Sequence, residues 1–151
     1  MTNERLLELG LTLPTVPKPM ATYATAVRHA DLLYTSGHGP LRADGSFVVG
    51  KLGATLDVAG GKEAARLTGL AVLATVNAYL GSLDRVVRII KVLGMVNATP
   101  EFVDHPAVIN GFSDLMVQVF GDAALAARSA VGTASLPAGI AVEVEAIFEV
   151  R

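Results

Sequence analysis

IAVEVEAIFEV, residues 140–150, is the stretch of sequence that decides the fold. Apolar side chains occupy every second position from Ile140 to Phe148, while the other positions include Glu143, Glu145 and Glu149. A period of two is that of a β-strand, so we expect one face of this strand to be buried and the other to be largely acidic. Such a strand is stable only inside a sheet whose apolar face is covered.

Two further strands are predicted before it. The run Val86–Val96 is dense in Val and Ile and is bounded by polar residues and a proline, which is typical of an interior strand. A shorter β-favouring run at Ser129–Ala134 ends at a turn over 136–139.

Two segments carry apolar residues at spacings of three and four, the period of an amphipathic helix. The first runs from about Gly60 to Leu80, with Asp57 upstream as a cap and Gly81 as its end. The second covers 108–120, with Asp104 near its start. The small residues of the first helix would let it lie close against a sheet.

The beginning of the chain is different in character. Residues 1–21 predict a short helix followed by a proline-rich arm that serves as a connector, and residues 22–151 the main domain. Within it, Tyr23–Val27 and Leu32–Ser36 predict a hairpin, and Phe47–Val49 predicts a third short strand after an Asp-Gly turn. The short helix is expected to be capped by Asn3 and ended by Gly10.

The resulting element order, β-β-β-α-β-α-β-β, indicates an α+β domain in which a mixed sheet carries both helices on one face. The chain has no further helix to cover the other face. Its composition points the same way, because 52% hydrophobic residues against 17% charged ones is a surplus for a small domain. We therefore expect association with further copies in closed rotational symmetry.

The residue composition and the absence of certain motifs disfavour several classes of function. There is no cysteine, and His29, His38 and His105 show no metal-binding spacing, so we expect no metal site. A net charge of -2 with scattered basic residues gives no surface for nucleic acid. We expect no membrane segment, no secretory signal and a cytoplasmic protein. Neither a phosphate-binding loop nor a GxSxG elbow is present.

Four segments occur together and in order: LLYTSGHGP (32–40), VINGFSDL (108–115), ARSAVGTASLP (127–137) and VEVEAIFEV (142–150). Together they resemble the RidA family, also called YjgF-like or L-PSP proteins, and specifically a side branch of it. The resemblance implies a chorismate-mutase-like fold and a homotrimer with a central β-barrel and clefts between subunits. It also implies hydrolysis of reactive enamines and imines to 2-keto acids and ammonia, without a metal or an organic cofactor.

The resemblance also assigns roles to residues. Arg128 matches the arginine that grips the substrate carboxylate, and Glu143 matches the glutamate that helps to place the hydrolytic water. The expected ligand-contacting residues are Tyr23, Ser36, Gly37, His38 and Asn110. From the residues alone, a structural role stays open for each of them. Arg128 would pair with a glutamate of a neighbouring strand, Glu143 would face solvent, and His38 would pack in a turn.

Two departures from the family pattern keep other functions open. Ala130 stands where cysteine or threonine is common, and His38 stands where glutamine is common. A trimer that binds a small carboxylate or keto acid without turning it over is therefore a second hypothesis. Endoribonuclease activity, implied by the L-PSP name, is a third, which the acidic balance and low aromatic content disfavour.

Overall fold

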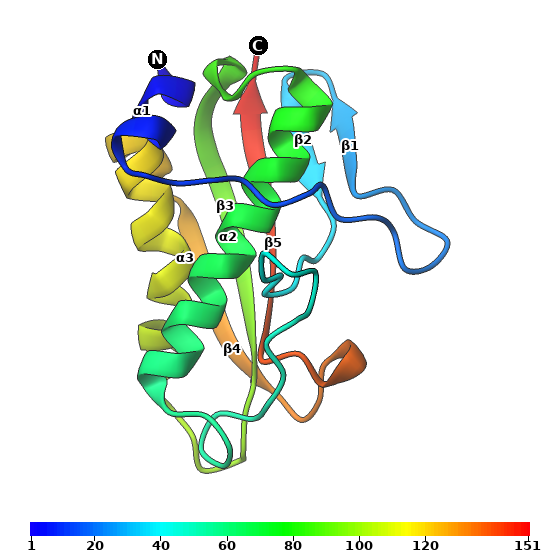
Figure 1. The fold of residues 1–151 in the computed structure, drawn as a ribbon, viewed down its shortest axis with the longest axis vertical. Helices are drawn as coiled ribbons and strands as arrows, with labels where there is room; N and C mark the ends of the chain where they lie inside the picture. Colours follow the sequence, from blue (N-terminus) through cyan, green and yellow to red (C-terminus); the bar gives the residue numbers. More distant parts are fainter.

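Strand β5 (Val142–Val150) lies in the middle of a five-stranded sheet in the computed structural model, which describes residues 1–151 (Figure 1). All neighbouring strands are antiparallel except β3 and β4, which are parallel. The sheet is therefore mixed, as predicted. Its strand order is β1 (Ala26–His29), β2 (Leu32–Thr35), β5, β3 (Val86–Asn97) and β4 (Ala127–Thr133).

Two long helices, α2 (Val58–Leu80) and α3 (His105–Phe120), cover one face of this sheet (Figure 1). A third and shorter helix, α1 (Thr2–Glu8), contacts α3. Single helical turns η1 (Leu83–Arg85), η2 (Gly121–Ala124) and η3 (Pro137–Gly139) precede β3, β4 and β5. No helix is long and apolar enough to cross a membrane.

The alternation predicted for β5 is confirmed. Val142, Val144, Ala146 and Phe148 are buried, whereas Glu145 on the other face is exposed. Because side chains of a strand alternate between its faces, the buried set points at the helices and the glutamates point at the uncovered face. We call this uncovered side of the sheet the open face.

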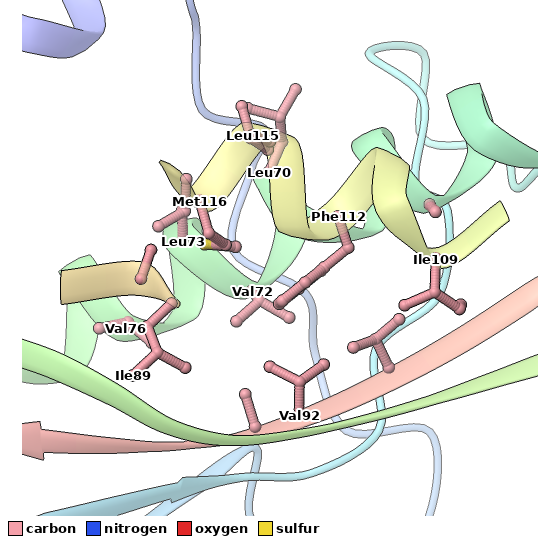
Figure 2. Packing of buried hydrophobic residues seen from close by; sticks show 14 of the residues in the cluster. Leu70, Val72, Leu73, Val76, Ile89, Val92, Ile109, Phe112, Leu115 and Met116 are labelled. Carbon is pink, nitrogen blue, oxygen red and sulfur yellow. The ribbon is translucent and has the colours of Figure 1, made fainter. Parts of the chain in front are cut away.

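The core lies between the helices and the sheet, as Figure 2 shows. Phe112 and Ile109 of α3 meet Val72 of α2 and Val92 of β3, and all four are buried. Helix α3 and strand β3 approach each other closely at Gly94, where a Cβ would lie only 2.6 Å from the Ile109 side chain. Glycine thus lets α3 lie against the sheet.

The ends of α2 follow the sequence prediction. Asp57 occupies the N-cap, where its side chain accepts a hydrogen bond of 2.8 Å from the Gly60 amide. Gly81 ends the helix with φ of 81°, in the left-handed region that favours glycine. The helix begins two residues earlier than predicted, at Val58, because the cap fixes its first turn.

Two expectations for the first third of the chain were wrong. Phe47–Val49 is no strand but makes two isolated bridges, Leu41 with Phe47 and Val49 with Ile140, because the segment crosses between two partners instead of running along one. The hairpin begins at Ala26, which leaves Tyr23 in the preceding loop.

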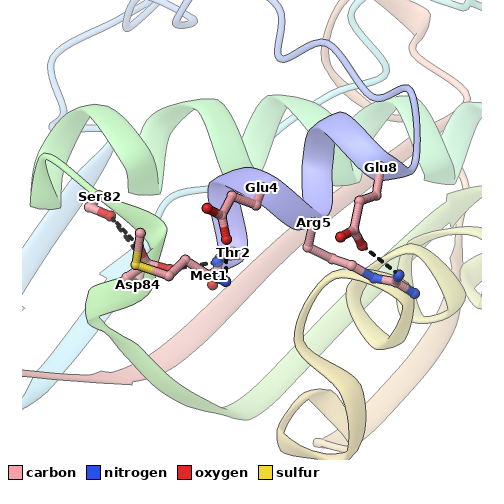
Figure 3. Close-up of polar contacts among 7 residues, drawn as sticks. All are labelled: Met1, Thr2, Glu4, Arg5, Glu8, Ser82 and Asp84. Carbon is pink, nitrogen blue, oxygen red and sulfur yellow. Dashed lines mark hydrogen bonds and ion pairs between the residues drawn. The ribbon is translucent and has the colours of Figure 1, made fainter.

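Helix α1 is held to the body by buried Leu6, by its backbone and by one arginine. The Thr2 amide donates to Asp84 Oδ1 at 2.6 Å (Figure 3), and this bond lowers the pKa of the Asp84 carboxyl. Arg5 Nε donates to the Gln118 carbonyl at the end of α3 at 3.0 Å. Met1, and not the expected Asn3, occupies the cap position, because the helix starts at the second residue.

We predict that Phe112→Ala lowers the free energy of unfolding by about 3–5 kcal/mol, because it opens a cavity between α3 and the sheet. Urea denaturation at one fixed protein concentration measures the change. Val103→Ala is the control, since Val103 is 72% exposed and its truncation should cost less than about 0.5 kcal/mol. An equal loss in both variants would contradict this account of the core.

Candidate functional site

A cavity of about 680 Å³ opens beside the start of β5 and the end of β2. Five of the seven residues singled out from the sequence line it, namely Tyr23, Ser36, Gly37, His38 and Glu143. They come from the loop before β1, the segment after β2, and β5. The fold thus gathers side chains that are more than a hundred positions apart in the sequence.

The segment after β2 is fixed to β5 by a two-way backbone pairing. His38 and Val144 exchange amide-to-carbonyl hydrogen bonds of 3.0 Å in both directions. The side chain of Glu143, the residue before Val144, lies over Gly37, and a Cβ at Gly37 would overlap with Glu143 Oε1. A larger residue at position 37 would displace the Glu143 carboxyl from this place, so glycine here sets where that carboxyl lies.

Glu143 is half-buried in the wall of the cavity and makes no hydrogen bond or ion pair within the chain. Burial, and secondly the charge of Glu145, raises the pKa of this carboxyl. A carboxyl of raised pKa keeps its proton nearer to neutral pH and can donate it to a substrate. Such a group suits general acid–base chemistry.

His38 lines the same cavity, but both nitrogens of its ring are hydrogen-bonded within the chain. Nδ1 lies 2.7 Å from the Ser36 carbonyl oxygen, which can only accept, so Nδ1 carries the proton. Nε2 then accepts from the Thr75 hydroxyl of α2 at 2.8 Å. The residue is 4% exposed, and burial lowers its pKa against a smaller opposing effect of the Ser36 bond. Neither nitrogen is left for a ligand.

The proline-rich arm supplies part of the cavity wall, which the sequence analysis missed when it treated the arm as a connector. All residues from Thr15 to Ala21 except Pro19 line the cavity. Figure 1 shows the arm running from α1 past α2 to the hairpin. The Met20 amide donates to the Tyr23 hydroxyl at 3.2 Å and so closes the end of the arm. No sequence pattern signalled this contact.

Arg128 lies outside this cavity, on edge strand β4. Its Nη1 donates to Asn110 Oδ1 at 2.8 Å and to Ser113 Oγ at 3.1 Å, and its Nη2 reaches the Pro106 carbonyl at 3.4 Å. Asn110, which the family resemblance assigned to the ligand site, therefore lies beside Arg128 and orients its guanidinium. Ser113 was missed, although it follows Asn110 by three positions on the same helix and shares its face.

Arg128 and Glu143 do not meet within one chain. Arg128 is paired with Val92, and Glu143 with Met95, so β3 lies between their strands. Two strand spacings across and three residues along place their Cα atoms about 14 Å apart. Arg128 reaches towards helix α3, whereas Glu143 lies on the open face. The alternative pairing of Arg128 with Glu143 or Glu145 is wrong for the single chain.

No group of three or more His, Asp or Glu side chains is arranged to hold a metal ion. What the chain offers instead is one guanidinium with oriented partners, and one acid of raised pKa in a cavity wall. A guanidinium with oriented partners can bind an anion, and a carboxyl of raised pKa can donate a proton.

Comparison with known proteins identifies the family. A family model described as "YjgF/chorismate mutase-like, putative endoribonuclease" matches residues 3–145. The chain belongs to this family. The resemblance seen in the four sequence segments is thereby confirmed, and so is the YjgF-like fold class.

Two similar crystal structures each match 99% of the chain. That of Atu1372, a protein of unknown function from Agrobacterium tumefaciens, is 42% identical, is covered to 92% and has a TM-score of 0.92. That of a "putative endoribonuclease" from Shewanella oneidensis MR-1 is 29% identical, is covered to 99% and has a TM-score of 0.95. Protein TCP17 of Trypanosoma cruzi is 42% identical over 147 residues, which is 97% of this chain and 92% of TCP17.

We predict that the buried neutral His38 makes the protein less stable in mild acid. The unfolded chain takes up a proton near pH 6.5, whereas the folded state resists it, so unfolding free energy falls as pH drops below that value. His38→Gln should reduce this loss between pH 7.5 and 5.5. Urea midpoints at both values measure it, and the other two histidines contribute equally to both proteins. Parallel pH dependences would refute the assignment.

Proposed function

We propose that this YjgF-like protein hydrolyses reactive 2-imino and enamino acids to 2-keto acids and ammonia, in a site that two copies of the chain form together. The observation that supports the proposal most is the separation of Arg128 from Glu143. Arg128 is held by hydrogen bonds to α3 and Glu143 lines the cavity, yet the two side chains lie on opposite faces of one sheet. A site that uses both groups must take one from each of two chains.

The open face favours such an assembly. Val27 pairs with Tyr34, which pairs with Ile147, and these three form an apolar row across it. Val27 is 56% exposed in the single chain. Apolar surface of this extent on a sheet is typical of a face that another subunit covers. Closed threefold symmetry, with the sheets forming a central barrel, would cover the open faces of all three copies.

The chemistry follows from the two groups. The guanidinium of Arg128 would hold the substrate carboxylate, with Asn110 and Ser113 fixing its plane. The carboxyl of Glu143, protonated, would transfer its proton to the enamine carbon and so produce an iminium ion. As a carboxylate it would then orient water, which adds to the C=N carbon. As the adduct loses ammonia, its hydroxyl proton passes to the Glu143 carboxylate, which leaves the 2-keto acid and restores the carboxyl group.

The two-chain arrangement can be tested by mixing inactive subunits. Arg128→Ala and Glu143→Gln should each abolish acceleration of the hydrolysis of 2-iminobutyrate generated in situ. Trimers reassembled from equal amounts of both variants should regain about a quarter of native activity, because random assembly pairs an intact Arg128 with an intact Glu143 at that frequency.

Mixing each variant with itself is the control for the reassembly step. A site contained within one chain would leave the mixed trimers inactive, since no single chain carries both groups. Full activity of either variant alone would remove that residue from the mechanism. An unaccelerated reaction with the native protein would end the proposal.

One alternative has observations in its favour. Ala130 offers no hydrogen-bonding side chain two positions after Arg128, and the His38 ring has no free nitrogen. A trimer that binds keto acids without turnover would need neither group. Calorimetry that shows keto-acid binding in a protein without imine hydrolysis would select this function. Endoribonuclease activity is disfavoured, because Lys18 is the sole basic residue in the cavity wall.

A further inference from the structure

The cavity beside Glu143 has an apolar wall that the proposed chemistry does not use. Arm residues contribute Val16, Pro17 and Met20 to it, and Leu41, Phe47 and Ile140 contribute the rest. None of these side chains can take part in proton transfer or bind a carboxylate. Their common property is that they offer apolar surface to an occupant.

The polar and apolar parts of the cavity lie at different ends. Glu143 is packed against Gly37, while Ile140 and Phe47 lie 3.1 and 3.2 Å from the position of a Cβ on Gly39. Gly37 and Gly39 flank His38 in the segment paired with β5, so their Cα atoms are about 7 Å apart. A molecule whose reacting carbon is at Glu143 would therefore direct its side chain towards Phe47 and Ile140.

The size of the cavity indicates how large that side chain is. Cavities of about 300–1,000 Å³ hold ligands of the size of a drug molecule. At about 680 Å³ this one falls inside that range. The smallest imino acids, with a methyl or methylene group for a side chain, would leave the apolar end filled with water. Displacing that water by an apolar group is favourable.

We propose that the site is selective for 2-imino and 2-keto acids with a large apolar side chain, aromatic or branched aliphatic. This selectivity rests on the proposed function. Phe47 and Met20 are its main determinants: Phe47 lies at the apolar end, and Met20 belongs to the arm that closes the cavity. Neither touches the reacting atoms, so both act on the choice of substrate.

The experiment compares imines formed in situ by an L-amino acid oxidase from phenylalanine, leucine and alanine. We expect kcat/KM for the phenylalanine and leucine imines to exceed that for the alanine imine by about tenfold or more, since each methylene in an apolar pocket contributes roughly that factor. Phe47→Ala and Met20→Ala should lower this ratio. Equal kcat/KM values for all three imines would overturn the proposal.

Tyr79→Ala is the matched control, because Tyr79 is a half-exposed aromatic residue of α2 outside the cavity wall. It should leave the ratio of large to small substrates unchanged. The Met20→Ala variant excludes misfolding as the cause of a lower ratio, since Met20 is 73% exposed and its truncation removes no core packing. A ratio that falls equally in Tyr79→Ala would overturn the assignment to this cavity.

A binding measurement separates this inference from the proposed function. If the native protein accelerates no imine hydrolysis, the proposed function fails, and calorimetry then tests selectivity alone. Phenylpyruvate and 4-methyl-2-oxopentanoate should bind about tenfold or more tightly than pyruvate, for the same reason of apolar burial. Pyruvate binding as tightly as either larger acid, or no binding of the larger acids, would overturn the inference.

Discussion

Side chains alternate between the two faces of a strand, and this constraint determines what a single chain can and cannot do. On β5 it sends Val142 and Val144 into the core and Glu143 to the open face. On β4 it sends Arg128 towards α3. Moving Glu143 by one position along β5 would put its charge in the core, because both of its neighbours on the strand are buried.

The same alternation couples assembly to chemistry. The face that presents Glu143 also presents the apolar row of Val27, Tyr34 and Ile147, and β4 with Arg128 is an edge strand. In the proposed trimer, association buries apolar area and completes the site in one step. A monomer would retain the cavity and its acid without the anion clamp.

Local patterns of the sequence predicted the scaffold well, because their physics is local. The period of β5, the Asp57 cap and the left-handed Gly81 depend on neighbours within a few positions, and the structure confirms them. Phe47–Val49 was wrong as a strand for the opposite reason. Its bridges to Leu41 and Ile140 depend on contacts from distant parts of the chain, which β-favouring residues alone do not specify.

In the candidate site too, the residues in recognisable sequence segments were predicted, and those that depend on distant contacts were not. Family segments pointed to Arg128, Glu143 and Asn110, and the structure shows Asn110 bonded to Arg128. Ser113 was missed because a serine on a helix carries no distinctive pattern. Both ring nitrogens of His38 are bonded to Ser36 and Thr75, and no spacing in the sequence reveals this contact between the segment after β2 and helix α2.

The arm has a consequence for how such a protein can change over time. Met20 and Val16 are exposed residues whose replacement disturbs no core packing, yet they form a wall of the cavity. Selection for stability therefore leaves them free to vary, while Ile109, packed against Gly94, keeps a glycine at position 94. Under the proposed selectivity, related proteins could accept different substrate side chains through changes in the arm alone, with Arg128, Glu143 and the scaffold unchanged.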